Sequence, residues 1–208
     1  TGPVAWYEAH IESGEGLNVM GGLFPGAPTV GVGFTEEHGW GATVNKPDLV
    51  DIYVLEMNPE NPNQYRLDGE WRDLQVGEVK LELKLWGFIP WSVKREVLRS
   101  VHGPALRTEH GVYAIRYAGI DEMKQVEQWL AMNKAKNFEE WKAAVALNHI
   151  QSFNFVYANR HGDIHFIHNA QLPVRVPGWN WQQYLPGDRS DLIWQRYHPI
   201  SALPQVTN

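Results

Sequence analysis

The segment from Asn18 to Asp51 constrains this chain most, because it combines glycine-rich strands with a pair of aspartates. The remaining residues of the segment, such as Val30, Val32 and Phe34, favour β-structure. Glycine weakens a strand, so its repeated use predicts bulges or close approach of a ligand to the backbone. Turn formation alone would account for only part of the set, which comprises Gly21, Gly22, Gly26, Gly31, Gly33, Gly39 and Gly41.

Several motifs follow one another along nearly the whole chain, beginning with a strand at Tyr7. They are N-V-x-G-x-x-x-P-G-x-P (Asn18 to Pro28), G-W-G-A-T (Gly39 to Thr43), D-L-V-D (Asp48 to Asp51), V-H-G-P (Val101 to Pro104), A-K-N-F-E-E-W (Ala135 to Trp141), N-F-V-Y-A-N-R-H-G-D-I (Asn154 to Ile164) and P-G-W (Pro177 to Trp179). In this order they resemble the β-subunit of the penicillin acylase family. These are N-terminal-nucleophile amidases, which include acyl-homoserine lactone acylases.

The resemblance implies an α+β fold, with antiparallel sheet layers and a docked helical pair, as in part of the αββα N-terminal-nucleophile hydrolase fold. We expect residues 1–208 to form a single incomplete domain, the interior of an acylase β-subunit. Family members use a serine whose own α-amino group is the general base. That serine would lie upstream of Thr1, and the oxyanion-hole asparagine would lie downstream of Asn208.

The implied function is therefore that of a fragment of an amide hydrolase that cleaves N-acyl compounds, either β-lactam antibiotics or acyl-homoserine lactones. The fragment alone is predicted to be inactive. The alternative is a non-catalytic module that binds acyl ligands. Thr1 as a nucleophile is disfavoured, because Gly2-Pro3 is a poor start for a catalytic strand.

The resemblance also assigns site residues. Val44 follows G-W-G-A-T and would donate its backbone N–H to the oxyanion of the tetrahedral intermediate, although a plain strand valine is the alternative. An acyl pocket would be shaped by small residues and an apolar wall, at Ala27, Gly31, Val32, Ala42, Ser152 and Phe153. Without the resemblance, these are ordinary interior positions.

A second set of residues would bind calcium in the intact parent. Asp48 and Asp51 would contribute side chains, and Val50 and Pro173 would contribute carbonyl oxygens. Calcium takes six to eight oxygen ligands, so these residues supply only part of a shell. A solvated turn is the alternative for the two aspartates.

Composition limits the partners. The net charge of -6 leaves no basic stripe for nucleic acid, and no apolar run is long enough to span a membrane. Expected partners are the remaining segments of the acylase, namely its α-subunit and the rest of the β-subunit, and a small N-acyl substrate. Self-association through open sheet edges is a further possibility. The resemblance implies a periplasmic or secreted parent.

Local patterns predict the main elements. Asp68-Gly69 predicts a hairpin turn, and the alternation from Val79 to Leu85 predicts a half-buried strand with one wet face. Phe88 to Trp91 is either a pocket rim or, more in keeping with its apolar sequence, a buried hairpin tip.

Two helices are expected after residue 120. Asp121 would cap the first, with an apolar stripe at Met123, Val126, Trp129 and Leu130. Asn137 and Glu140 would form a capping box for the second, with a stripe at Phe138, Trp141 and Val145.

The histidines predict no zinc site. His165 and His168 have odd spacing within a strand and should face opposite ways, and no H-E-x-x-H motif occurs. His102, in V-H-G-P, is interpreted as structural.

Overall fold

A computed structural model describes residues 5–120 and 122–208 of the chain. These residues fall into two compact units. Unit 1 consists of the described residues within Thr1–Asp48, Asp121–Pro173 and Arg196–Asn208, and unit 2 consists of Leu49–Ile120 and Val174–Gln195. The prediction that residues 1–208 form one incomplete domain stays a prediction, and each unit is described by itself.

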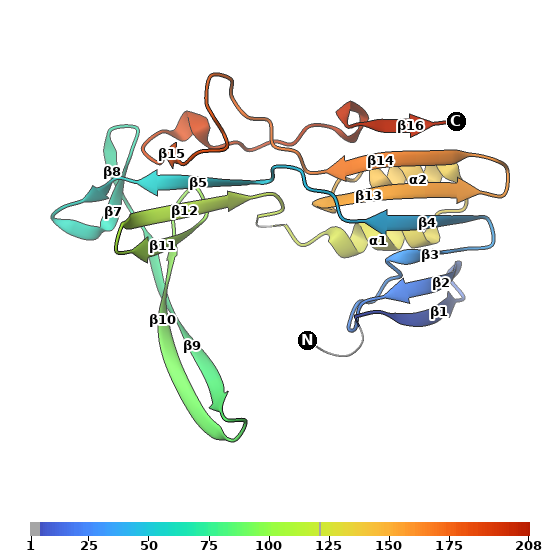
Figure 1. Ribbon diagram of the computed structural model, residues 1–208, viewed down its shortest axis with the longest axis horizontal. Coiled ribbons are helices and arrows are strands. Elements are labelled where there is room, and N and C mark those ends of the chain that lie inside the picture. Colours follow the sequence, from blue (N-terminus) through green and yellow to red (C-terminus); the bar gives the residue numbers. More distant parts are fainter. Residues whose placement is uncertain (1–4, 121) are drawn as a thin grey trace. The chain divides into compact units, whose positions relative to one another are not determined.

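Unit 1 is an antiparallel sheet with two helices on one face (Figure 1). The strand order is β1-β2-β3-β4-β13-β14-β16. The elements are β1 (Tyr7–Ser13), β2 (Leu17–Leu23), β3 (Val32–Phe34), β4 (His38–Thr43), α1 (Gln125–Lys134), α2 (Phe138–Val145), β13 (Ser152–Asn159), β14 (Ile164–Ala170), a 3₁₀ turn (Ile200–Ala202) and β16 (Gln205–Thr207).

The core of unit 1 lies between this sheet and the helices. Trp141 of α2 is fully buried and packs against Phe155 and Tyr157 of β13, with ring centroids 6.2 and 4.9 Å away. Alternate residues of β13 point to the same face, which is why Phe155 and Tyr157 meet one helix together. The docked helical pair predicted from the sequence is thus confirmed.

The ends of the two helices match the sequence to different degrees. Asn137 caps α2 as expected: its Oδ1 accepts from the Glu140 N–H at 2.9 Å, and the Glu140 carboxylate accepts from the Lys136 N–H. For α1, the predicted cap Asp121 lies outside the described residues. The predicted stripe is wrong in part, because Met123 precedes α1 and is exposed, while the buried face carries Gln128, Met132 and Asn133.

Unit 2 contains a second sheet with strand order β15-β5-β12-β11-β10-β9, in which only β15 and β5 are paired in parallel, and a three-stranded sheet β6-β7-β8. The elements are β5 (Val50–Leu55), β6 (Met57–Asn58), β7 (Asn61–Leu67), β8 (Glu70–Asp73), β9 (Gln75–Leu85), β10 (Ile89–Arg99), β11 (Pro104–Thr108), β12 (Gly111–Tyr117), β15 (Leu185–Pro186) and a 3₁₀ turn (Ser190–Leu192).

Unit 2 has its own core around Tyr53, which is fully buried and donates its hydroxyl to the Leu192 carbonyl at 2.8 Å. The predicted hairpin at Asp68-Gly69 is confirmed between β7 and β8, since both residues have positive φ, 51° and 87°. Glycine adopts this conformation without the steric cost that a Cβ brings.

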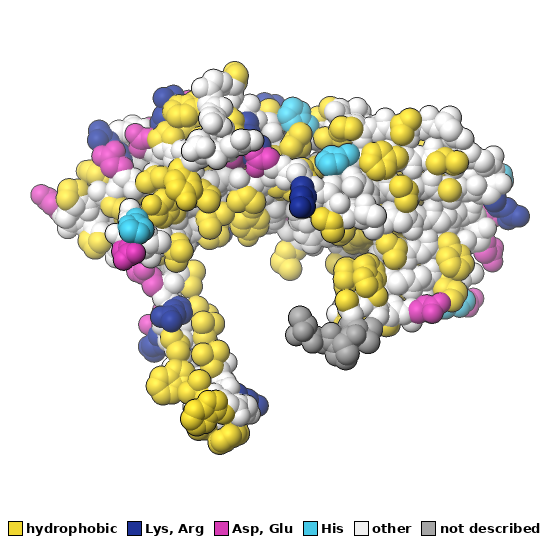
Figure 2. Space-filling model, in the orientation of Figure 1, with side chains coloured by type: hydrophobic (Ala, Val, Ile, Leu, Met, Phe, Trp, Pro, Cys, Tyr) yellow, Lys and Arg dark blue, Asp and Glu magenta, His cyan; other side chains and the backbone are white. Residues whose placement is uncertain are grey.

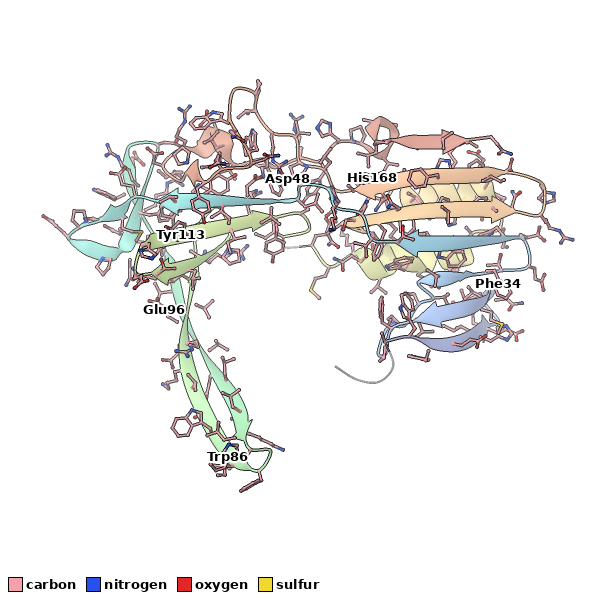
Figure 3. The ribbon with its side chains drawn as sticks, in the orientation of Figure 1. Phe34, Asp48, Trp86, Glu96, Tyr113 and His168 are labelled. Carbon is pink, nitrogen blue, oxygen red and sulfur yellow. The ribbon has the colours of Figure 1, made fainter. Side chains whose placement is uncertain are left out.

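The hairpin of β9 and β10 differs from the prediction. The two strands pair over eleven residues each, but β11 pairs with only Leu98 and Arg99 of β10. The rest of the ribbon has no described layer against either face, so the strand from Val79 to Leu85 is exposed on both faces instead of half-buried. The tip is also exposed, with Trp86 at 87% and Phe88 at 74% (Figure 3).

The fold class predicted from the sequence, α+β with antiparallel layers, is confirmed. Among the described residues, no helix has the length and apolar character needed to cross a membrane.

Candidate functional site

An apolar cavity of about 310 Å³ lies within unit 1, between the sheet, helix α1 and the loop after β2. Four of the six residues predicted to shape an acyl pocket line it: Ala27, Gly31, Ala42 and Phe153. Val32 and Ser152 do not line it, because each is next in sequence to a lining residue and neighbouring strand residues point to opposite faces. The complete lining is Trp6, Phe24, Ala27, Pro28, Thr29, Gly31, Ala42, Gln125, Val126, Trp129 and Phe153.

Aromatic rings form the walls of this cavity. Trp6 and Phe24 contact each other with ring centroids 4.1 Å apart, and Trp129 of α1 meets Phe153 of β13 edge to face at 6.1 Å. Gly31 lies beside the Trp6 ring, since a Cβ at this position would be in van der Waals contact with it at 3.5 Å. The cavity therefore offers a rigid apolar surface with little capacity for hydrogen bonds.

Two buried amides hold α1 against the loop before β3 and the loop before β13, and sequence reasoning missed both. Asn133 accepts from the Val30 N–H at 2.8 Å and donates to the Val30 carbonyl at 2.9 Å. Gln128 accepts from the N–H groups of His149 and Ile150 at 2.6 and 2.8 Å. In the sequence, Gln128 and Asn133 are simply polar residues within a predicted helix, and such residues usually lie on its exposed face.

The strands behind the cavity approach each other closely at two glycines. A Cβ on Gly21 would lie 2.1 Å from the Val32 carbonyl oxygen, and one on Gly33 would lie 2.4 Å from that of Met20. At these two glycines the close approach is therefore between backbones, whereas the sequence predicted bulges or close approach of a ligand to the backbone. The Gly31 peptide is fixed as well, since its N–H donates to Gly22 O and its carbonyl accepts from Trp40 Nε1, both at 3.0 Å.

Val44 lies just beyond β4. The ladder between β4 and β13 ends at the Thr43–Asn154 pair, one residue earlier, and the Val44 residue is 78% exposed. The Asn154 side chain donates to the Val44 carbonyl at 3.4 Å, and its Oδ1 lies 3.0 Å from His168 Nδ1. Because Oδ1 can only accept, this contact requires a proton on His168 Nδ1. Figure 3 labels His168 in unit 1. His165 and His168 have different partners: the His165 ring contacts Thr207, and the His168 ring contacts Asn154.

The predicted calcium ligands are divided between the units: Asp48 and Pro173 belong to unit 1, and Val50 and Asp51 belong to unit 2. The Asp51 carboxylate is fully buried and accepts from Trp194 Nε1 at 2.6 Å and Arg175 Nε at 3.0 Å. A calcium ion would have to share this carboxylate with a guanidinium. No group of three or more His, Cys, Asp or Glu suited to a metal occurs in the described part of the chain.

A larger open cleft of about 810 Å³, also in unit 1, borders the end of α2. It contains the contact between His149 Nδ1 and the Glu122 carboxylate at 2.8 Å, and Gln171 donates to the same carboxylate at 3.2 Å. None of the residues predicted from the sequence as site residues lines this cleft.

Comparison with known proteins gives a consistent result. The family model for penicillin amidase matches residues 1–208. An acyl-homoserine lactone acylase, PvdQ, of Pseudomonas fluorescens is 29% identical over 151 residues, covering 69% of this chain and 19% of that protein. Penicillin G acylase of Escherichia coli is 28% identical over 221 residues, covering 95% of this chain and 25% of that protein.

Among solved structures, a thermostable penicillin G acylase from Alcaligenes faecalis matches with a TM-score of 0.86 and 26% identity, over 99% of this chain and 37% of that one. The chain thus spans about a fifth to a quarter of the length of these two curated relatives.

Proposed function

Because the chain belongs to the penicillin amidase family, we propose that it is part of an acylase that hydrolyses the amide bond of N-acyl compounds. The two relatives named above differ in the substrate that their names give, a penicillin or an acyl-homoserine lactone. Both substrates join an apolar acyl group to a polar amine through an amide. The acyl group is the shared element that this chain would recognise.

The observation that carries this proposal is the apolar cavity around Gly31. A cavity of about 150 Å³ lined by aliphatic and aromatic side chains is enough to take up benzene, and this one is about 310 Å³. Burial of an acyl group at roughly 25 cal/mol per Å² supplies the binding energy, while Ala27, Ala42 and Gly31 leave space that larger side chains would fill. Phe153 and Trp129 would contact the acyl group directly.

Val44 would contribute to the chemistry through its backbone. Amide hydrolysis passes through a tetrahedral oxyanion, which is stabilised by preorganised donors about 2.7–3.1 Å away. Val44 lies one residue past the end of the β4–β13 ladder and is exposed, which supports access of an oxyanion to its N–H. Asn154 binds the Val44 carbonyl and contacts His168, so these two side chains would position the peptide that follows the donor.

The remaining parts of the proposal extend beyond these residues. In the intact acylase, Asp48, Val50, Asp51 and Pro173 would bind a structural calcium ion, and the protein would be periplasmic or secreted. The 208 residues alone would bind acyl ligands without turnover, since the resemblance places the nucleophilic serine outside them.

Ligand binding by the 208-residue chain tests the proposal, with phenylacetate and dodecanoate as probes. At a ligand concentration of 100 times Kd, binding stabilises the chain by about 2.7 kcal/mol, which corresponds to a rise in Tm of roughly 5–11 °C at this size. The variant Ala42→Leu, which fills the cavity, should lose the shift. Ala158→Leu, on an exposed position of β13, should keep it.

Four results would contradict parts of the proposal. If neither probe raised Tm, or if Ala42→Leu retained the full shift, the cavity would not be an acyl site. Turnover of a chromogenic phenylacetyl amide by the isolated chain would show that the nucleophile lies within these residues. Binding by the chain but no hydrolysis by the intact acylase would favour the non-catalytic binding module.

A further inference from the structure

The ribbon formed by β9 and β10 carries one apolar face and one polar face. In the antiparallel register, Leu85 pairs with Ile89, Leu83 with Trp91 and Leu81 with Val93, so these side chains lie on the same side. The residues between them point to the opposite face, which carries charges such as Lys80, Glu82 and Lys94. The apolar face consists of Val79, Leu81, Leu83, Leu85, Ile89, Trp91, Val93 and Val97.

This apolar face is exposed at every residue except Val93, which is half-buried. Leu81, Leu83 and Leu85 are 43–46% exposed and Trp91 is 54% exposed, and Figure 2 shows apolar side chains gathered along the hairpin. A contiguous apolar patch of this kind is uncommon on a soluble monomer and marks an interaction surface. A two-stranded ribbon is also only marginally stable in water without a layer packed against it.

The size of the face decides between possible partners. A stable interface between two free proteins involves roughly 20–30 residues a side, and this face has only the eight named above. A second copy of the chain docked here alone would bury too little surface for a lasting dimer. A polypeptide that is already held to the chain elsewhere can dock on a smaller patch, because this face does not have to supply the whole interface.

The relatives contain such a polypeptide. The solved penicillin G acylase matches 99% of this chain, including the ribbon, yet 37% of its own length. Most of its chain is therefore available to cover the equivalent surface.

We propose that the apolar face of β9 and β10 is a docking surface for acylase polypeptide outside residues 1–208. The occupant is an apolar segment with an acidic group beside it. Arg95 sits opposite Val79 on the same face, is exposed, and makes no ion pair with any described residue. Coverage by an apolar segment would enclose this guanidinium, and a carboxylate would then be its natural partner.

The proposal rests on the assignment to an acylase, but not on the acyl cavity, which belongs to the other unit. Its test is hydrogen exchange in the full acylase polypeptide compared with the isolated 208-residue chain. We expect backbone amides from Val79 to Leu85 to exchange at least about ten-fold more slowly in the full polypeptide, because coverage suppresses local opening.

Variants identify the face. In the full polypeptide, Leu83→Glu should abolish most of this added protection and speed proteolysis at the hairpin. Glu82→Lys, at the neighbouring position on the polar face, is the matched control and should leave both unchanged. Arg95→Glu should reduce the protection more than Lys94→Glu does.

Other outcomes overturn the proposal. Equal exchange rates in the full polypeptide and the isolated chain would show that nothing covers the ribbon. A concentration-dependent dimer of the isolated chain that Leu83→Glu dissociates would assign the face to a second copy, and sedimentation with phosphatidylcholine vesicles would assign it to a lipid surface. Amide hydrolysis is measured in the same preparations, so loss of activity with ribbon protection intact would count against the function alone.

Discussion

We expect His102 to make the folded chain less stable as the pH falls. The residue lies in the V-H-G-P turn, fully buried in unit 2, with its ring 4.6 Å from that of Tyr53. The backbone N–H of His102 donates to Ser100 Oγ at 3.2 Å. This turn contact and the burial of the ring agree with the structural role predicted for the residue. Burial, and secondly the Arg116 guanidinium, lower the pKa of His102 from 6.5 to about 4.

The sign of the effect follows from the neutral form being favoured in the folded state. The unfolded chain takes up the proton near pH 6.5, whereas the folded chain resists it until about pH 4. The stability that depends on neutral His102 is therefore fully present above pH 6.5 and is lost as the pH falls toward 4. The loss amounts to about 2 kcal/mol between pH 7.5 and pH 5, and about 3 kcal/mol by pH 4.

Urea unfolding at a series of pH values measures this loss. The variant His102→Gln removes the titrating group, so its free energy of unfolding should change less with pH than that of the original chain, by about 2 kcal/mol between pH 7.5 and pH 5. Burial also lowers the pKa of His38 and His165. The original chain and the His102→Gln variant both retain these two histidines, so the difference between their pH curves isolates His102. His110→Gln, at an exposed position, should follow the original chain. If the curves for His102→Gln and the original chain ran parallel, the reasoning about His102 would be refuted.

Three further substitutions test the packing. Asn133→Ala leaves the buried N–H and carbonyl of Val30 without their partner, which should cost about 2–4 kcal/mol and lower Tm by roughly 4–16 °C; an unchanged Tm in calorimetry would exclude the two hydrogen bonds. Gly21→Ala should destabilise by at least about 1–3 kcal/mol, because its Cβ would meet the Val32 carbonyl, whereas Gly14→Ala, with open space around it, serves as the control. Asp51→Ala removes the acceptor of Trp194 and Arg175, and chemical denaturation should show a loss of about 3–5 kcal/mol; a loss below 1 kcal/mol would contradict a buried ion pair.

Sequence reasoning located the parts of the fold that depend on local chemistry. Asp68-Gly69 identified a turn because few residues adopt positive φ, and Asn137 with Glu140 identified a helix start because the two side chains cap each other's backbone groups. Four of the six residues that the resemblance assigned to an acyl pocket, Ala27, Gly31, Ala42 and Phe153, line one cavity, although no local rule would have joined them. The other two, Val32 and Ser152, do not line it.

The errors have a common physical cause, which is that burial depends on what packs against an element. The alternation from Val79 to Leu85 correctly indicated one apolar face, but no described layer covers it. In α1, Gln128 and Asn133 occupy buried positions because backbone groups of distant segments supply their hydrogen bonds. Neither partner can be identified from the helix sequence alone.

The amide of Asn133 has a consequence for how precisely the cavity is built. An apolar contact tolerates sliding, because one methyl group can replace another at little cost. Asn133 instead matches a donor to an acceptor and an acceptor to a donor on the same peptide, Val30. A shift of α1 by a single residue would break both bonds together, so intermediate positions of the helix are excluded. These two hydrogen bonds thereby fix the distance between Trp129 and Gly31. In the proposed acyl site, that distance would limit the size of the acyl group that fits.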